Sequence, residues 1–401
     1  MNRSLRIVIA ALVAIAIGAG AFSAGVVFGS VRPVVDPASA IATLAAGTAP
    51  KDPVVRAVEE TQRIIDKKAL KRSSEASLSA GAIKGMVESL DDKYAVYFDP
   101  KHFEYFNEQT TGEFYGIGVT ISDKDGKVFI VSTIKGTPAE KAGIKAEDVI
   151  VSVDGITRDP WTTEEIVKRV RGAEGTKVKL TLSRKGEAKP LAFTIKRAKI
   201  TYPNVVTEMV GKDVGYIRVG QFNGHTTEDL KNAIDELGTK GAKGYLLDLR
   251  ENPGGLLDQA TGVVSLFVQE GEVVRIDSRT GPEDVLSVNG NVATNAPLVV
   301  LVDENSASAS EIVAAALQDH ARATVVGVTT FGKGSVQTIE DLSFGGAIKL
   351  TTAHYLSPKK RVIDGKGVKP DVVVKMKPEN QMPRSSDTQF KKALETLRSK
   401  F

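Results

Sequence analysis

The feature that most limits the fold is a regular alternation of strand-like and helix-like segments between residues 198 and 377. Short apolar runs typical of buried strands are followed by segments with helical periodicity, and then by further apolar runs. The expected strands are Val214–Val219, Gly244–Leu249, Leu298–Val302 and Thr324–Val328, and the expected helices are Thr226–Leu237, Leu256–Phe267 and Ala309–His320. This order predicts an α/β core, layered and with a largely parallel sheet, whose ligand site lies beyond the carboxyl ends of the strands.

The first unusual segment at such a strand end is Asp248–Gly255, which reads Asp-Leu-Arg-Glu-Asn-Pro-Gly-Gly and precedes an expected helix. Backbone N–H groups in a glycine turn before a helix can hold an oxyanion or a phosphate. Neither the Walker A spacing nor the dinucleotide-binding glycine pattern is present, so an oxyanion is the better candidate.

The second unusual strand end is Asp303–Glu311, which contains three serines before a helix. Ser308 and Glu311 have the spacing of a capping box, and that structural role is a sufficient explanation of the serine on its own. A chemical role becomes attractive because Lys333, which lies between two glycines, and Gln337 follow the next strand. Their spacing of four places both on one side of either a strand or a helix.

Residues 112–197 change to short alternating strands with turns between them. Pro138 opens a short helix that Ala142-Gly143 closes, and an alternating strand then ends at Asp154-Gly155. This order of elements resembles a PDZ domain. The resemblance implies that Gly116, Ile117, Gly118 and Val119 form a carboxylate-binding loop beside a strand edge that takes an extended peptide.

Taken together, the segments resemble the carboxyl-terminal processing peptidases, or tail-specific proteases, of serine peptidase family S41, over residues 53 to 376. The resemblance implies that Ser308 is the nucleophile, Lys333 the general base and Gln337 the residue that orients the lysine. It also assigns the oxyanion hole to the backbone N–H groups of Gly254 and Ala309. The matching motifs include the PDZ module and the runs Asp248–Arg250, Asn252–Gly255, Ser306–Glu311, Gly332–Gly334 and Gly365–Asp371.

The chemistry of a serine and lysine pair sets a condition on the site. A serine hydroxyl needs an adjacent base, and a lysine serves as that base only when it is neutral. Burial must therefore lower the pKa of Lys333, so its surroundings are expected to be apolar. His320 is the alternative base, but it lies about three turns along the helix from Ser308 and should point away.

Two rival interpretations follow from the same residues. The chain could be a PDZ scaffold with an inactive protease core, although Ser308, Lys333 and Gln337 are all present. A β-lactamase-like enzyme is excluded because no lysine stands three residues after any serine of the Ser306–Ser310 run. One departure from the family pattern is Lys93-Tyr94-Ala95 in place of Pro-Tyr-Ser, which we expect to affect the N-terminal helical segment and not the active site.

The N-terminus indicates the compartment. Residues 7–31 carry no charged side chain and follow Arg3 and Arg6, which predicts either a retained membrane anchor or a cleaved signal peptide within residues 1–31. In both cases the basic start stays in the cytoplasm. The rest of the chain is then expected on the extracytoplasmic side, in the periplasm or at the cell surface.

Composition limits the partners and cofactors. The chain has no cysteine and four scattered histidines, so neither a thiol nucleophile nor a metal site is expected, and no cofactor. A net charge of +4 with mixed signs gives no reason to expect a nucleic-acid partner. The resemblance to a PDZ domain and to the tail-specific proteases implies protein or peptide substrates with free apolar C-termini.

The two ends of the exported part are the least informative. Residues 53–111 contain two amphipathic stretches, 53–70 and 79–90, which could form a scaffold or an arm through which the chain makes a homo-oligomer. Residues 378–401 form a C-terminal tail with a helical end, and the pattern of this tail predicts no role.

Overall fold

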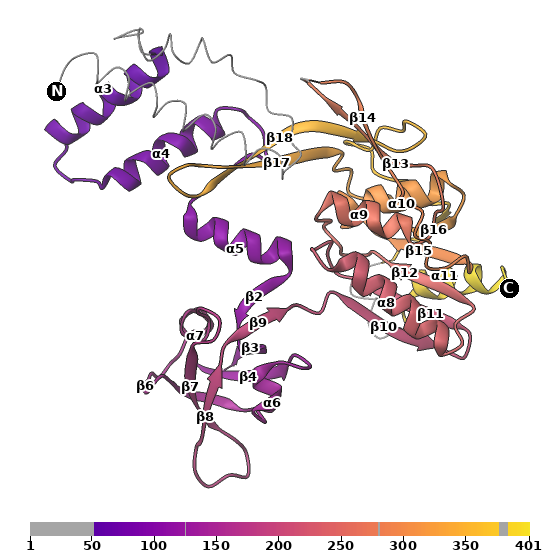
Figure 1. Ribbon diagram of the computed structural model, residues 1–401, viewed down its shortest axis with the longest axis horizontal. Helices are drawn as coiled ribbons and strands as arrows, with labels where there is room; N and C mark the ends of the chain where they lie inside the picture. Colours follow the sequence, from indigo (N-terminus) through magenta and orange to yellow (C-terminus); the bar gives the residue numbers. More distant parts are fainter. Residues whose placement is uncertain (1–51, 125, 280, 377–383) are drawn as a thin grey trace, which may run out of the picture. The chain divides into compact units, whose positions relative to one another are not determined.

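The computed structural model describes residues 52–124, 126–279, 281–376 and 384–401 (Figure 1). The chain divides into two compact units at Ala82 and Ile83. The first unit contains α3 (Pro53–Lys68) and the start of α4 (Glu75–Glu88). Asp52 caps α3, because its side chain accepts a hydrogen bond from the Val54 N–H. The two predicted amphipathic helices are thus present.

The predicted anchor or signal segment, residues 7–31, lies outside the described residues. Within the described part of the chain, none of the helices has both the length and the apolar character needed to cross a membrane.

The part of the chain after residue 204 is built on a six-stranded sheet in the order β10, β11, β12, β15, β16, β19. From β11 onward neighbouring strands are parallel, whereas β10 pairs antiparallel with β11 at the edge. The strands are β10 (Val205–Val210), β11 (Val214–Val219), β12 (Gly244–Asp248), β15 (Leu298–Val302), β16 (Ala323–Gly327) and β19 (Val372–Val373). The predicted strands and helices of this layer occur within two residues of their expected bounds.

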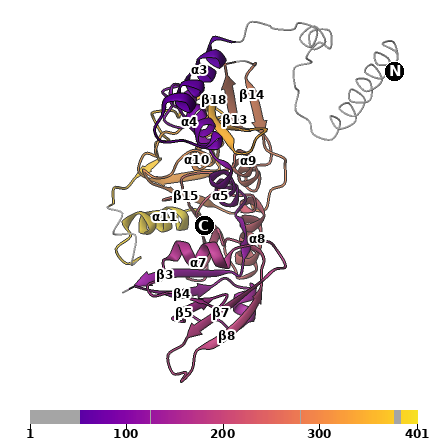
Figure 2. The same cartoon turned by 90° about the vertical axis from the view of Figure 1, so that its left-hand side faces the viewer.

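Helices cover both faces of this sheet. One face packs against α8 (Thr226–Thr239), α9 (Leu257–Ser265) and α10 (Ala309–Asp319). The other face packs against α11 (Thr388–Arg398), and in Figure 2 α11 and α8 flank the core strands from opposite sides. Because successive strand side chains alternate between faces, Ile217 and Leu247 join the first layer, whereas Tyr216 and Leu246 join the second. The C-terminal tail is therefore part of the core.

A second sheet corrects the prediction of one largely parallel sheet. It is antiparallel, with the order β1, β18, β13, β14, and β17 also pairs with β18. Its strands are β1 (Val96–Phe98), β13 (Glu272–Ser278), β14 (Asp284–Ser287), β17 (Ser335–Asp341) and β18 (Ala347–Leu356). The α/β region is consequently mixed, because it contains an antiparallel sheet as well as the mainly parallel core sheet.

The PDZ unit has its own core, formed around Ile130, Ile150 and Leu180. Its sheet follows the order β3, β4, β5, β7, β8, with β6 paired to β5, so that β3 lies at an edge. The strands are β3 (Val119–Lys124), β4 (Lys127–Thr133), β5 (Val149–Val153), β6 (Ile156–Thr157), β7 (Lys177–Ser183) and β8 (Leu191–Lys196). The helices are α6 (Pro138–Lys141) and α7 (Thr163–Val170). An open strand edge beside a helix is the geometry that accepts an added peptide strand.

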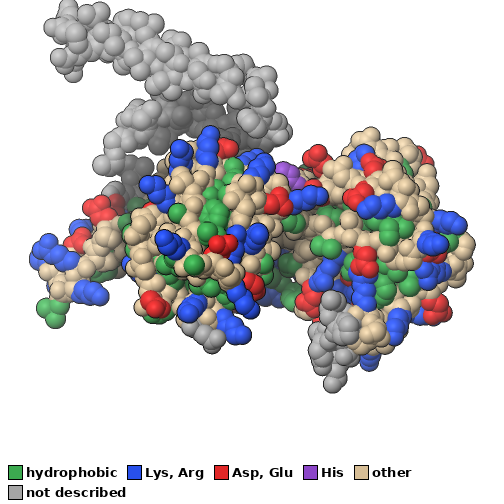
Figure 3. Space-filling view, turned by 90° about the horizontal axis from the view of Figure 1, so that it is seen from below, with side chains coloured by type: hydrophobic (Ala, Val, Ile, Leu, Met, Phe, Trp, Pro, Cys, Tyr) green, Lys and Arg blue, Asp and Glu red, His purple; other side chains and the backbone are tan. Residues whose placement is uncertain are grey.

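Two connections flank the PDZ unit. The helix α5 (Pro100–Thr111) precedes it, and the strands β2 (Glu113–Gly116) and β9 (Ala198–Thr201) pair antiparallel at its entry and exit. On the face shown in Figure 3, basic and acidic side chains are interspersed and no single-sign patch dominates.

Candidate active site

Ser308 lies where β15 has ended and α10 begins. Its backbone has φ 54° and ψ −115°, a region that residues with a side chain rarely adopt. Such strain persists only when the surroundings enforce it, and it commonly marks functional positions. Here the sharp turn presents Ser308 at the edge of a cavity at the carboxyl end of the sheet.

Gly254 lies directly against this turn. A Cβ atom at position 254 would stand 2.7 Å from Ser308 Cβ and 2.9 Å from the Ala309 nitrogen, so only glycine fits. The Gly254 N–H donates to Asn252 Oδ1 at 2.9 Å. The Ala309 N–H has no hydrogen-bond acceptor among the described residues. The two amides assigned to an oxyanion hole are thus brought together beside the serine.

One cavity of about 490 Å³ collects the predicted residues. Ser308, Lys333, Gln337, Gly254 and Ala309 all line it, although they come from separate parts of the sequence. No hydrogen bond joins the Ser308 hydroxyl to the Lys333 ammonium. The structure therefore brings the predicted groups into one site without joining nucleophile and base.

Lys333 is half-buried, and its Nζ lies 4.6 Å from the centre of the Tyr94 ring. Burial lowers the pKa of Lys333, and the positive charge of Lys349 acts in the same direction, while Asp92 and Glu311 oppose them. This is the direction that a neutral general base requires.

The contact with Tyr94 corrects one expectation. The segment Lys93–Ala95, which departs from the family pattern, lies at the active site and does not only affect the N-terminal helical segment. It reaches the site because β1 pairs with β18, and because Asp92 Oδ2 accepts a hydrogen bond from the Thr351 N–H at 3.2 Å.

Gln337 bonds to groups other than Lys333, the residue that it was expected to orient. Its Nε2 donates to Ser335 Oγ at 2.8 Å and to the Ser335 carbonyl at 3.3 Å, and it makes no hydrogen bond to Lys333. A bulge between Val336 and Gln337 shifts the register of β17 against β18. Gln337 shares the cavity with Lys333, but the orienting contact is not made in this structure.

Glu311 is a site residue whose full role the sequence did not reveal. Its fully buried carboxylate accepts from the Ser308 N–H at 2.9 Å and the Lys333 N–H at 2.8 Å. It also accepts from the Gly332 N–H at 2.7 Å and Thr330 Oγ1 at 2.5 Å. The capping-box spacing predicted the first contact. No local pattern could predict the other three, by which one carboxylate joins the Ser308 turn to the Lys333 turn.

Tyr355 is a second residue that sequence reasoning missed. It is buried, it lines the same cavity, and its hydroxyl donates to the Lys333 carbonyl. Its backbone N–H donates to the Gly334 carbonyl at 2.8 Å. Burial raises the pKa of Tyr355 well above the usual value, so the ring stays neutral and acts as a hydrogen-bond donor.

His320 is not placed to act as the alternative base. Its Nε2 lies 2.7 Å from the carbonyl oxygen of Glu272 in β13, and it is not among the residues that line the cavity. Among the described residues, no group of His, Cys, Asp or Glu is arranged to hold a metal ion.

The predicted carboxylate loop lines a second, smaller cavity. Gly116, Ile117, Gly118 and Val119 border it together with apolar side chains of β3, β5 and α7. Gly118 has φ 82°, and a Cβ atom there would meet the Thr137 side chain at 2.4 Å, so the loop requires glycine at this position.

Comparison with known proteins identifies the class to which this fold and site belong. Residues 213–374 match the model of peptidase family S41, residues 129–184 match a PDZ domain, and residues 15–102 match the N-terminal domain described for the activating protease CtpB. The chain belongs to peptidase family S41 and is a serine peptidase with a PDZ domain. The family resemblance drawn from the sequence is confirmed.

Individual relatives resemble most of the chain. It is 41% identical over 313 residues to the carboxy-terminal processing protease CtpA of Bacillus subtilis (strain 168), covering 78% of this chain and 67% of the relative. It is 43% identical over 304 residues to a carboxy-terminal-processing protease of Bartonella bacilliformis, covering 74% and 69%. A solved photosystem II D1 C-terminal processing protease is 29% identical, with a TM-score of 0.47, covering 80% of this chain and 92% of that chain.

Proposed function

We propose that this protein is a C-terminal processing endopeptidase that cleaves exported proteins by a Ser308 and Lys333 dyad. The observation that carries the proposal is the shared cavity, in which the strained serine, the half-buried lysine and the amides of Gly254 and Ala309 lie together. The lowered pKa of Lys333 supports its role as the base.

The proposed reaction proceeds through an acyl-enzyme. Neutral Lys333 takes the proton of the Ser308 hydroxyl as Oγ attacks the scissile carbonyl carbon. The N–H groups of Gly254 and Ala309 stabilise the resulting oxyanion. The lysine then gives its proton to the leaving amine as the peptide bond breaks. A water molecule next attacks the ester carbonyl while neutral Lys333 takes its proton, and the lysine returns that proton to Ser308 Oγ as the ester bond breaks.

The proposal requires a rearrangement of side chains and of one backbone amide in the cavity. Ser308 and Lys333 must approach to hydrogen-bond distance, Gln337 must turn from Ser335 toward the lysine, and the Gly254 N–H must turn toward the substrate. Catalytic hydrogen bonds are often long before substrate binds and tighten in the complex. We expect substrate binding to bring Ser308 and Lys333 together.

Substrate choice is assigned to the PDZ unit. The apolar lining of the cavity beside Gly116–Val119 supports recognition of apolar C-terminal tails by the open edge of β3. We place the chain on the extracytoplasmic side, anchored or exported, on the strength of the uncharged run at residues 7–31.

The test compares wild-type protein with Ser308→Ala on one tagged protein that ends in an apolar tail. Wild type should shorten the substrate and the variant should not, with mass spectrometry locating the cut. A tail-binding scaffold with an inactive core would give equal binding and no cut in both proteins. Cleavage by Ser308→Ala above a tenth of the wild-type rate would exclude the dyad.

A further inference from the structure

The last helix of the chain, α11, lies beyond the residues that match the peptidase family model. It covers one face of the core sheet, where Phe390, Ala393 and Leu397 are buried against strand side chains such as Leu246 and Leu301. Its first turn is fixed by Asp387, whose Oδ1 accepts from the Phe390 N–H at 2.8 Å. The helix is thus firmly docked.

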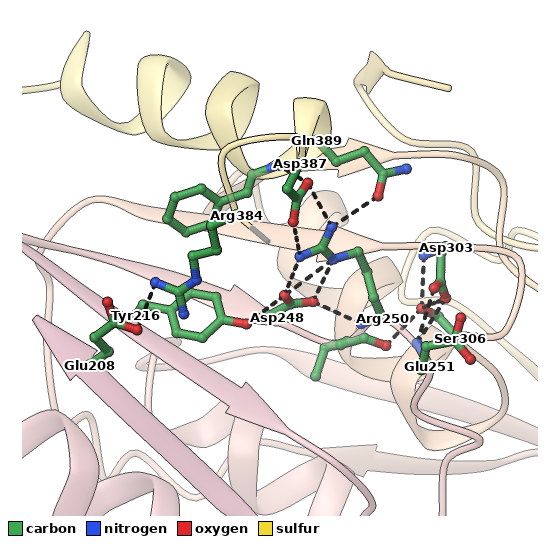
Figure 4. A network of polar contacts seen from close by, with 12 residues as sticks. Glu208, Tyr216, Asp248, Arg250, Glu251, Asp303, Ser306, Arg384, Asp387 and Gln389 are labelled. Carbon is green, nitrogen blue, oxygen red and sulfur yellow. Dashed lines mark hydrogen bonds and ion pairs between the residues drawn. The ribbon is translucent and has the colours of Figure 1, made fainter. Parts of the chain in front are cut away.

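Asp387 also reaches a buried arginine, as Figure 4 shows. Arg250 Nη2 lies 2.9 Å from Asp387 Oδ2, and Nη1 donates to Asp387 Oδ1 at 3.1 Å and to Gln389 Oε1 at 3.2 Å. The rest of the guanidinium group donates to Asp248, with Nη2 to Oδ2 at 2.7 Å and Nε to Oδ1 at 2.9 Å. Tyr216 completes the group by donating to Asp248 Oδ2 at 2.8 Å.

Burial makes each contact of this cluster important for the position of the Arg250 side chain. Arg250 is 4% exposed and both carboxylates are 2% exposed or less. Two carboxylates face one guanidinium, so removal of Asp387 leaves the Arg250 charge balanced by Asp248 but takes away the contacts that hold Nη1 and Nη2 from the side of α11. Asp387 therefore restrains where the Arg250 side chain, and with it the chain at residue 250, can lie.

Arg250 opens the loop that carries the proposed oxyanion amide. Glu251 follows with φ 58°, and its N–H donates to Asp303 Oδ1 at 3.0 Å. The Asn252 carbonyl accepts from the Ala307 N–H and from Ser310 Oγ, each at 3.0 Å. The loop is thus held by the nucleophile turn along its length and by Arg250 at its start.

We propose that Asp387 of the C-terminal helix is a positioning residue for catalysis, because through Arg250 it restrains the start of the loop that carries the Gly254 amide, the group that must turn from Asn252 to the oxyanion. The proposal rests on the proposed function. It makes the C-terminal tail part of the catalytic apparatus, although Asp387 touches no reacting atom.

The decisive variant is Asp387→Ser in the full chain. Serine is a good N-cap residue, so the helix keeps its cap while the link to Arg250 is lost. The matched control is Asp213→Asn, which weakens the exposed 2.9 Å bridge between Asp213 and Arg398 at the other end of α11. Both variants perturb the same helix, but only the first reaches the loop.

Two readouts are taken at a temperature where both variants are folded by circular dichroism. For Asp387→Ser, we expect kcat on a peptide substrate to fall by about tenfold or more with KM within about threefold, since small misplacement of catalytic groups is costly. Amide hydrogen exchange in residues 249–255 should become faster. The control should match wild type in both.

The exchange experiment does not depend on activity, so it separates this inference from the proposed function. Unchanged exchange in residues 249–255 would overturn the inference. Faster exchange with unchanged kcat would overturn it too, because the loop would then not need the restraint. Failure of the proposed function would show itself differently, as cleavage of the substrate by the Ser308→Ala variant.

Discussion

The two halves of the active site are built in different ways. Ser308 and Gly254 lie on turns of the parallel core, where Asn252, Glu311 and Ser310 tie the backbone with hydrogen bonds. Gln337 lies in β17 of the antiparallel layer, where it bonds to Ser335, and Lys333 lies in the turn just before that strand, with its ammonium group against the Tyr94 ring.

This difference indicates which half is ready for reaction. The Ser308 turn is fixed by hydrogen bonds within and beside it, so it is the more ordered half, and there only the Gly254 N–H has to change its partner from Asn252. Lys333 is held by its main-chain N–H, which donates to Glu311, while its ammonium group lies in the cavity beside the Tyr94 ring and makes no hydrogen bond to Ser308. We infer that substrate binding completes the base half more than the nucleophile half. Four experiments test this comparison.

The largest effect is expected from the base itself. Lys333→Arg should be as inactive as Lys333→Ala, with kcat/KM lower by about a thousandfold or more, because arginine keeps its proton at usable pH. Peptide cleavage followed by chromatography measures this, and wild type should be insensitive to chelators. An active arginine variant would show that this half needs only a positive charge.

The next effect concerns the link between the halves. Glu311→Gln places an NH₂ group opposite buried N–H donors, which should cost about 1 to 3 kcal/mol of the free energy of unfolding. We expect kcat to fall about ten- to hundredfold, since both turns lose their common acceptor. Denaturant unfolding and initial rates measure the two changes. Glu304→Gln, at an exposed neighbouring position, is the control. Equal kcat in both variants would show that activity does not depend on the link that Glu311 makes between the two halves.

A smaller effect concerns the charge around the base. The charged and titratable groups around Lys333 are Lys349, Asp92, Glu311, Tyr94 and Tyr355. Activity should rise with pH through the pKa of Lys333, because the neutral form is the active one. Removing the Lys349 charge raises that pKa, so Lys349→Met should move the rising limb to higher pH and lower the rate at neutral pH roughly threefold.

Two opposite substitutions test the direction in which neighbouring charges shift the pKa of Lys333, as read from pH profiles of kcat/KM. Asp92→Asn removes a neighbouring negative charge, so its rising limb should move to lower pH. Lys349→Arg keeps the charge and should follow wild type. Shifts of the same sign in Lys349→Met and Asp92→Asn would contradict this electrostatic account.

The smallest effect is expected away from the catalytic cavity. Amidating the C-terminus of an apolar-tailed substrate should raise KM about three- to tenfold with kcat nearly unchanged, because the carboxylate contacts the loop at Gly116–Val119 and not the reacting bond. A substrate with an acidic tail serves as a second comparison. Equal KM values for all three would show that the PDZ unit does not select tails.

The local sequence determined the parts that short-range physics controls. The buried strands of the core appear as continuous apolar runs, α10 begins at its capping box, and glycines mark positions such as Gly118 and Gly254 where a Cβ would clash. The family resemblance then named Ser308 and Lys333, and the structure brings both to one cavity.

The antiparallel layer was decided by tertiary structure. Strands β17 and β18 are only partly buried and carry a register shift, so no clean alternation of apolar residues marks them. The contacts of Tyr94 and Tyr355 with Lys333 depend on that layer, and neither residue stands in a local pattern that would predict them.

The C-terminal helix shows the same limit most clearly. Its amphipathic pattern predicts a helix, but Asp387 and Arg250 are 137 residues apart, and a lone aspartate before a helix predicts only a cap. Asp387 and Arg250 meet because the apolar side of α11 is buried against the second face of the core sheet, which brings the start of the helix to Arg250. Periodicity within a segment reports which face is buried, and only the folded chain decides what that face meets.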